Sequence, residues 1–310
     1  MVEIDTYKTS VQYDPTHTTA LRNLFAREMR KRFEELMYGI KKSVVDNDCF
    51  GLQRDKIKVL QVTPAGKEVF AFARNQQKLE AFMSWLQEQV NKGILSVGEI
   101  KQLGLGVEKA WTDLYLLDSY KRGVIRVRME LINAGYDVPP IEDSGGVMVS
   151  MSTPFHIDRL GLIFTRAFNE LKGITDTMDM QISRVLAQGL ADGDGPRLIA
   201  RKLIAVINGD GVDRLGIRDS LGRFISAQRR AELLARTEII RAHHVATIQE
   251  YRNWRIAGVY VVAEFRTAGD DRVCPECESM EGKIFTLDEA EGVIPVHPSC
   301  RCIMLPMLKE

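Results

Sequence analysis

The stretch CPECESMEGKIFTLDEAEGVIPVHPSCRC, residues 274–302, decides how the end of this chain folds. It holds four of the protein's five cysteines and one of its five histidines. Cys274 and Cys277 form a CxxC pair, the spacing that lets two thiolates reach one ion from a tight turn. The sequence HPSCRC at 297–302 supplies a second half-site of the same kind. Two such turns joined by a loop are typical of a structural metal site.

Zinc is the ion that this pattern predicts, because Zn²⁺ prefers four nitrogen or sulfur ligands in a tetrahedron. Cys274, Cys277 and His297 are the first candidate ligands, since a CxxC turn facing an HxxC turn is compact. Cys300 and Cys302 compete for the fourth position. A site made of cysteines alone, without the histidine, is an alternative.

Three other roles for the cysteines compete with a metal site. A redox-active CxxC needs a thioredoxin-like βαβ context, which is not visible in this sequence. Disulfides are disfavoured because the start, MVEIDTYKTSVQYDPT, does not resemble a secretory signal. Free thiols without any site are the third alternative. The segment is too short to offset its ordering entropy by burial, so we expect a zinc ion to stabilise it, by on the order of 10 kcal/mol.

The composition sets wider limits on the function. The chain has 310 residues, and its 42 basic residues balance its 42 acidic residues, so no overall charge attracts it to nucleic acid or to a membrane. The longest apolar runs, such as VYVVA at 259–263, are far shorter than the roughly 18 residues of a membrane helix. We therefore expect a protein made in the reducing cytoplasm.

Apolar periodicity predicts a mostly α-helical protein with a small α+β domain at its C-terminal end. Asp14-Pro15 is typical of a helix start, and Ser226 is the expected cap of the last long helix. The stretch VYVVAEFRT after that helix predicts a strand. For the stretch 67–75, a strand and the beginning of a helix remain alternatives. The expected helices cover residues 15–44, 76–93, 107–134, 156–171, 175–188, 196–209 and 227–258.

A turn-rich segment at 137–154, with three prolines and a Gly-Gly pair, predicts the domain boundary. It separates a helical N-terminal domain, residues 1–140, from a C-terminal domain, residues 155–310, closed by the zinc-stapled β/loop segment. The amphipathic helix over 21–44 is expected either to pack within its own domain or to contact an assembly partner.

Five further residues invite a functional interpretation. His244, next to His243, falls on the apolar face of its helix, which favours a hydrogen-bonded core histidine over a metal ligand or a base. Glu289 and Glu291 match the ExE pattern of arginine-specific ADP-ribosyltransferases, but such a pattern is common in charged loops. Cys49 stands alone and is expected to be buried or half-buried.

An arginine-rich span at 197–255 holds twelve basic and six acidic residues. Arginine suits phosphate recognition, although a solvated helix face with local ion pairs explains the same pattern. The candidate nucleic-acid contacts are Arg223, Arg229, Arg230 and Arg236.

Three blocks of the chain resemble a known family. ARTEIIRAHHVATIQEY, TAGDDRVCPECESMEGKIF and HPSCRC follow one another in the order and spacing of the Mu F-like (SPP1-type) head morphogenesis family of tailed phages. The resemblance covers roughly residues 190–305, and YDPTHTTALRNLFAREMRKRF near the start is similar to the family's first helix. The family often has a tryptophan in the strand before the Gly-Asp pair, where this chain has Phe265.

The resemblance implies a structural minor head protein and not an enzyme. It implies a place in the virion head at the portal vertex, after assembly in the host cytoplasm, with a role in head morphogenesis and in DNA packaging or ejection. The implied partner is the portal protein, and major capsid or scaffolding protein and packaged double-stranded DNA are further candidates. An NAD-dependent ADP-ribosyltransferase-like enzyme and a non-specific DNA-binding factor are the alternatives, but the chain lacks a convincing set of NAD-binding residues.

Overall fold

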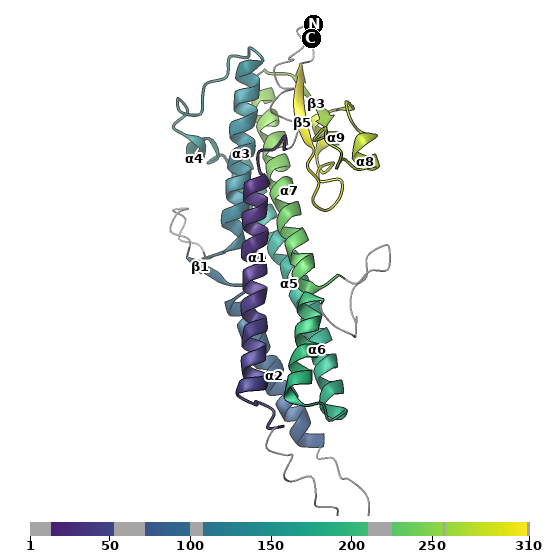
Figure 1. Ribbon diagram of the computed structural model, residues 1–310. Helices are drawn as coiled ribbons and strands as arrows, with labels where there is room; N and C mark the ends of the chain where they lie inside the picture. Colours follow the sequence, from purple (N-terminus) through teal and green to yellow (C-terminus); the bar gives the residue numbers. More distant parts are fainter. Residues whose placement is uncertain (1–13, 53–71, 100–107, 210–224, 257, 309–310) are drawn as a thin grey trace, which may run out of the picture. The chain divides into compact units, whose positions relative to one another are not determined.

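Helices account for most of the protein, as the sequence predicts. A computed structural model of the protein describes residues 14–52, 72–99, 108–209, 225–256 and 258–308. The helices in chain order are α1 (Thr19–Lys41), the π-helical turn η2 (Lys42–Asp46), α2 (Phe72–Lys92), α3 (Thr112–Asn133), α4 (Val147–Ser150), α5 (Pro154–Ala191), α6 (Pro196–Asn208), α7 (Ala227–Ile256), α8 (Pro275–Glu278) and α9 (Leu287–Ala290) (Figure 1). The strands are β1 (Val97–Glu99), β2 (Glu108–Ala110), β3 (Val261–Arg266), β4 (Ile284–Phe285) and β5 (Ile303–Leu308).

Helix α1 begins at Thr19 and not at Pro15, which corrects the predicted start. The reason is a turn held by Asp14, whose carboxylate accepts hydrogen bonds from the backbone N–H of Thr19 at 2.5 Å and of Thr16 at 3.2 Å. His17, inside this turn, has a φ of 52°, which no α-helix accommodates. Asp14 is therefore not the residue directly before the helix, and its carboxylate instead holds the first N–H of α1 from across the turn.

Two more predicted boundaries are wrong. Residues 108–110 form β2 and not the first turn of a helix, so α3 begins only at Thr112. The two helices expected at 156–171 and 175–188 are one continuous helix, α5. A lone glycine such as Gly173 costs a helix only about 1 kcal/mol. Leu171 and Met178 are buried on either side of it, and burial of such side chains outweighs that cost.

Other helix ends agree with the sequence. Helix α6 has Pro196 at its first turn and ends at Gly209, which has a φ of 86°. Ser226 accepts a hydrogen bond from the backbone N–H of Arg229 at 3.2 Å and so caps α7. Of the stretch 67–75, residues 72–75 begin α2, and the others lie outside the described residues.

The chain forms two compact units, and each is assembled from separate segments. Unit 1 contains residues 1–26, 109–168 and 233–310, and unit 2 contains residues 27–108 and 169–232. These units do not follow the division at 137–154 that the sequence predicts. The predicted separate folding of residues 1–140 and 155–310 remains a prediction.

Unit 2 buries apolar side chains from helices that are distant in sequence. Helix α6 packs on η2, so both chain segments of the unit, 27–108 and 169–232, contribute to its core. Its fully or nearly fully buried side chains include Met29, Phe33, Ile40, Val44, Leu86, Val90, Ile182, Leu186, Leu203 and Ile207. The apolar face predicted for residues 21–44 is therefore mostly buried within the protein, and only Leu24 of that face is clearly exposed. Cys49 is exposed, contrary to the prediction.

Unit 1 contains a three-stranded antiparallel sheet with the order β4-β3-β5. Val261 pairs with Leu308 and Arg266 with Ile303 along β3 and β5, while Ala263 pairs with Phe285 of β4. Alternate residues of β3 are buried, and Phe265 is fully buried. The predicted strand is thus the centre of the sheet.

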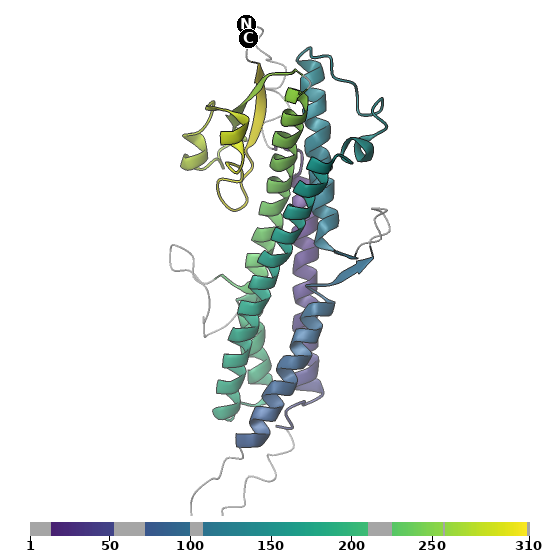
Figure 2. The same cartoon turned by 180° about the vertical axis from the view of Figure 1, so that it is seen from behind.

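Helices α3 and α7 run side by side in unit 1 (Figures 1 and 2). They approach so closely at Gly123 that a Cβ atom there would lie 2.6 Å from the carbonyl oxygen of His243 and 2.7 Å from the Cβ of Ala246. Ser119, one turn earlier, donates a hydrogen bond of 2.6 Å to the carbonyl of Ile239. Only glycine fits at position 123, and this packing fixes the helix against which the cysteine-rich segment lies.

Candidate metal centre

The cysteine-rich segment is part of the core of unit 1 and not a surface appendage. Cys277, Cys300 and Cys302 are buried in one apolar cluster. The same cluster contains Val127 and Leu131 of α3, Ile240, Ile248 and Tyr251 of α7, and Val261, Ala263 and Phe265 of β3. The segment therefore shares a core with α7 and the sheet, and Figure 1 shows α8 and α9 on the same side of α7 as β3 and β5.

The first half-site is a helix N-terminus. Cys274 caps α8 through its sulfur, which accepts a hydrogen bond from the backbone N–H of Cys277 at 3.3 Å. Pro275 occupies the first helical position, where its missing N–H costs nothing. This short turn holds the sulfur atoms of the two cysteines within 4.8 Å of each other.

The second half-site is a tight loop attached to α7. Ser299 has a φ of 62°, and its backbone N–H donates to the hydroxyl of Thr237 on α7 at 3.1 Å. The backbone N–H of Cys300 donates to the carbonyl of His297 at 3.1 Å. His297 Nδ1 lies 2.9 Å from the carbonyl oxygen of Pro298. A carbonyl only accepts, so Nδ1 carries the proton and the lone pair of Nε2 is left for a metal, which is the usual arrangement for a ligating histidine.

The structure brings the five predicted ligands into two overlapping groups. Cys274, Cys277 and His297 form one group, and Cys277, Cys300 and Cys302 form the other. Within each group the candidate ligand atoms all lie within 4.8 Å of one another. Cys277 belongs to both groups, so the two halves of the sequence motif meet at this residue. Sulfur and imidazole nitrogen are ligands that suit zinc, and the donor set therefore fits a metal ion.

The protonation of the buried thiols also suits a cation. Hydrogen bonding from Cys302 lowers the pKa of Cys300 to about 5. Burial and the neighbouring Cys300 raise the pKa of Cys277 to about 12. The hydrogen bond to Cys300, together with burial, raises the pKa of Cys302 well above its usual range. In this apolar surrounding the thiolate of Cys300 is stabilised by the protonated thiol of Cys302. A bound cation is needed before several thiolates can exist side by side.

An ion pair that no local sequence pattern predicts supports the site. Arg301, between the last two cysteines, donates two hydrogen bonds of 2.6 Å to the carboxylate of Asp270. Arg272 donates to the same carboxylate at 2.7 Å. These contacts lower the pKa of Asp270 below its usual range, with the hydrogen bond from Arg301 as the main cause. The only sequence signal for them is that both residues stand inside the blocks that carry the family resemblance.

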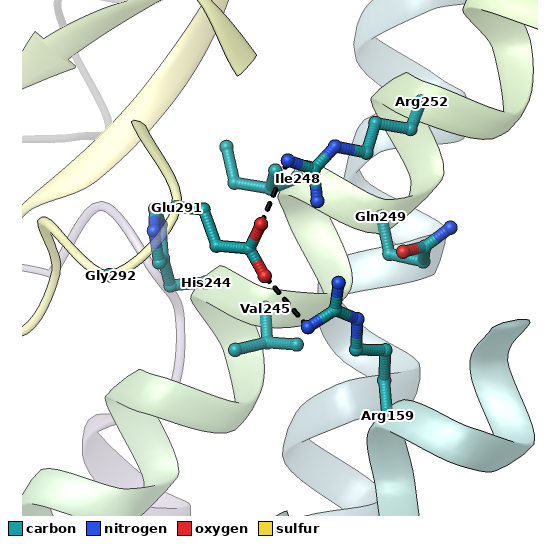
Figure 3. A pocket seen from close by; sticks show the side chains of 8 residues that line it. All are labelled: Arg159, His244, Val245, Ile248, Gln249, Arg252, Glu291 and Gly292. Atoms are coloured by element: carbon teal, nitrogen blue, oxygen red, sulfur yellow. Dashed lines mark ion pairs between the residues drawn. The ribbon is translucent and has the colours of Figure 1, made fainter. Parts of the chain in front are cut away.

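The two glutamates of the ExE pattern have structural contacts. Glu289 accepts hydrogen bonds from the backbone N–H and the hydroxyl of Thr286 in a capping box at the start of α9. Glu291 forms ion pairs with Arg159 of α5 at 2.7 Å and with Arg252 of α7 at 2.8 Å (Figure 3).

The cavity beside Glu291 has a volume of about 10 Å³, so it has room for no more than about one water molecule. Nothing in this arrangement supports the NAD-dependent alternative.

The histidine pair lies in the core, as predicted, but it is only partly hydrogen-bonded. His244 Nε2 lies 2.9 Å from the carbonyl oxygen of Ala290, whereas its Nδ1 and the Nε2 of His243 have no partner among the described residues. Burial lowers the pKa of His244 to about 4 and that of His243 well below its ordinary value. Both residues are therefore neutral core side chains at pH 7.

The candidate nucleic-acid residues have dissimilar surroundings. Arg229 is exposed and pairs with Glu232 at 3.7 Å. Arg230 is half-buried, its Nε has no partner among the described residues, and burial lowers its pKa. Arg236 donates to Asn23 at 2.8 Å. Arg223 lies outside the described residues. Contact with nucleic acid therefore remains a prediction.

The fold and the site define a predominantly helical protein whose C-terminal strands and cysteine-rich loops form a candidate metal-binding module. Residues 180–305, which contain all of that module's ligands, match the family described as Phage Mu protein F like protein. The family resemblance that the sequence shows is thereby confirmed over this range, and it supports a phage head-related protein. No match was found among curated proteins or among solved structures. Within the described residues, none of the helices has the length and apolar character needed to cross a membrane.

Proposed function

We propose that this protein is a structural minor head protein of a tailed phage, and that one zinc ion closes its C-terminal module. The observation that carries the proposal is a coincidence of position. The segment that matches the Mu F-like family is also the segment in which four cysteines and His297 come together in two overlapping groups, with Cys277, Cys300 and Cys302 buried in the core. A virion component needs a stable fold more than an open reaction site, and a buried thiolate-rich centre provides stability.

The ion is held by Cys277 together with Cys274 and His297, and by either Cys300 or Cys302 as the fourth ligand. Cys277 belongs to both groups of donors, so it is a ligand whichever of Cys300 and Cys302 is the fourth. When bound, zinc supplies charge neutralisation and a rigid connection between the two half-sites. With four protein ligands there is no open coordination position, so the proposed role of the metal is structural.

In this proposal the protein is located at the portal vertex of the head and takes part in morphogenesis and in DNA packaging or ejection. Portal protein is its first partner, and major capsid or scaffolding protein and packaged DNA are further partners to test. The family match supports a place in the virion, and the partners rest on the family resemblance alone.

Co-expression with the portal protein of the same phage, followed by affinity capture, tests this function. We expect the wild-type protein to be captured with portal protein and to be detected by mass spectrometry in purified particles. The Cys49→Ser variant should be captured like the wild type, because Cys49 is an exposed cysteine outside the metal centre. Absence of the protein from purified particles, together with no capture by portal protein, would overturn the proposal.

A further inference from the structure

A small cavity lies in unit 1, where the loop after α9 meets α5 and α7. Its lining includes side chains from all three elements: Arg159 of α5, His244, Val245, Ile248 and Arg252 of α7, and Glu291 of the loop (Figure 3). The cavity volume of about 10 Å³ is close to the smallest that can hold one water molecule. A molecule that binds here is therefore no larger than water.

The ring of His244 contributes a buried nitrogen that has no partner. The residue is 3% exposed, and its Nε2 lies 2.9 Å from the carbonyl oxygen of Ala290. A carbonyl only accepts, so Nε2 carries the proton of the neutral ring. Nδ1 is then left with a lone pair that accepts no hydrogen bond from the described residues.

The apolar part of the lining does not satisfy this nitrogen, because Val245 and Ile248 have no side-chain donors. A buried acceptor that loses its hydrogen bond to water on folding is unfavourable. In most proteins such groups are bonded either to other protein groups or to ordered water. The unpaired Nδ1 therefore indicates a donor inside the cavity.

The charged part of the lining limits what that donor can be. Glu291 pairs with Arg159 at 2.7 Å and with Arg252 at 2.8 Å. A guanidinium has five N–H donors and no acceptor, so the two arginines have N–H groups beyond these ion pairs. A molecule that suits the cavity donates to Nδ1 and accepts from a guanidinium. A halide ion only accepts and an ammonium ion only donates, whereas water does both.

We propose that this cavity holds one ordered water molecule, which donates a hydrogen bond to His244 Nδ1 and joins the ion-pair group of Arg159, Glu291 and Arg252. An ordered water of this kind typically makes about three hydrogen bonds to buried polar groups. It fastens the loop between the two cysteine half-sites to α5 and α7, beside the direct bond from His244 to Ala290. The site needs no metal ion, so this inference does not depend on the zinc centre.

A crystal structure of the wild-type protein, at a resolution that shows ordered water, tests the inference. We expect one oxygen atom at about 2.7–3.2 Å from His244 Nδ1 and at a similar distance from Glu291 or an arginine nitrogen. Long-range proton–nitrogen NMR spectra of isotope-labelled histidine should show the Nε2–H tautomer of His244. In His244→Phe the oxygen atom should be lost. His243→Phe is the matched control that should keep it, because His243 is similarly buried but does not line the cavity.

Several results would overturn the inference. One is the absence of an oxygen atom at this position in the wild-type protein, or a halide ion in its place. Another is a direct hydrogen bond from an arginine to Nδ1, and a third is the Nδ1–H tautomer, in which this nitrogen is a donor. An oxygen atom that stays in place in His244→Phe would show that the ion-pair group alone holds it. If the variants do not fold, the wild-type structure and the tautomer decide.

Discussion

Arg301 and Asp270 form a two-hydrogen-bond ion pair, with both N···O distances at 2.6 Å, that joins the loop of the second half-site to the turn preceding the first. The Asp270 side chain is almost completely buried. The pair therefore holds the two ends of the cysteine-rich segment together independently of any metal. It explains why a Gly-Asp turn and a Cys-Arg-Cys ending occur in the same module.

Replacement of Asp270 by asparagine should destabilise unit 1 by about 2–3 kcal/mol, because it leaves Arg301 without its charged acceptor. Denaturant unfolding followed by tryptophan fluorescence measures the change. Arg272→Gln is the control, since Arg272 is largely exposed and its loss should cost less than about 1 kcal/mol.

The same variant has a defined pH dependence. The pKa of Asp270 is lower in the folded protein than its ordinary value of 3.8, so the unfolded chain takes up the proton first. The ion pair's contribution is complete above about pH 4 and is lost as the pH falls below that value. The stability difference between wild type and Asp270→Asn should therefore shrink below pH 4, and a constant difference would contradict the assignment.

Replacement of Cys277 by serine should abolish metal binding, because this residue belongs to both groups of candidate ligands. Residues 259–308 should then become sensitive to limited proteolysis, since a structural zinc contributes on the order of 10 kcal/mol to such a segment. Cys49→Ser should retain the wild-type metal content and protease resistance. Of Cys300→Ser and Cys302→Ser, one should behave like Cys277→Ser and the other should be nearly silent.

The buried His244 should make unit 1 sensitive to mild acid. Its pKa is about 4 in the folded protein and about 6.5 when it is unfolded, so the unfolded state binds the proton over this interval. As the pH falls from 6.5 toward 4, His244 should contribute a loss of stability of about 1.4 kcal/mol per pH unit, in addition to the loss that the neighbouring His243 contributes. In His244→Gln this slope should be smaller at the same metal loading. Equal slopes in the two proteins would show that His244 is not responsible.

Replacement of Gly123 by alanine should destabilise the contact between α3 and α7. The added methyl group would meet backbone and Cβ atoms at less than 3 Å, and overpacking of this kind typically costs about 1–3 kcal/mol. Gly161→Ala is the matched control, because nothing lies within 4 Å of its Cβ position in α5. There the higher helix propensity of alanine should leave stability unchanged or slightly raise it. A thermal melt that ranks the two variants in the opposite order would contradict the packing.

Much of the helical architecture could be predicted because its signals are local. Pro196, Gly209 and Ser226 set helix ends through their own backbone and capping preferences, and the structure agrees with all three. The starts of α1 and α3 could not be placed from the same rules. In α1 the side chain of Asp14 acts across a turn, and residues 108–110 pair with β1 as a strand instead of beginning α3.

The ligand residues of the candidate site were predictable from the sequence, but the tertiary contacts that support them were not. CxxC and HPSCRC name the five donors, and the structure brings them together. The ion pair of Asp270 with Arg301 depends on a tertiary contact across 31 residues, which spacing rules do not describe. Likewise, the interleaving of segments in the two units has no local sequence signal.

Native mass spectrometry combined with elemental analysis, on protein purified without added metal, tests the central claim most directly. The account predicts about one zinc ion per chain and no disulfide, with Cys274, Cys277, Cys300 and Cys302 reactive toward alkylating reagent only after the metal is chelated. Metal-free protein whose mass shows two disulfides would mean that the segment is held covalently, and it would contradict the account.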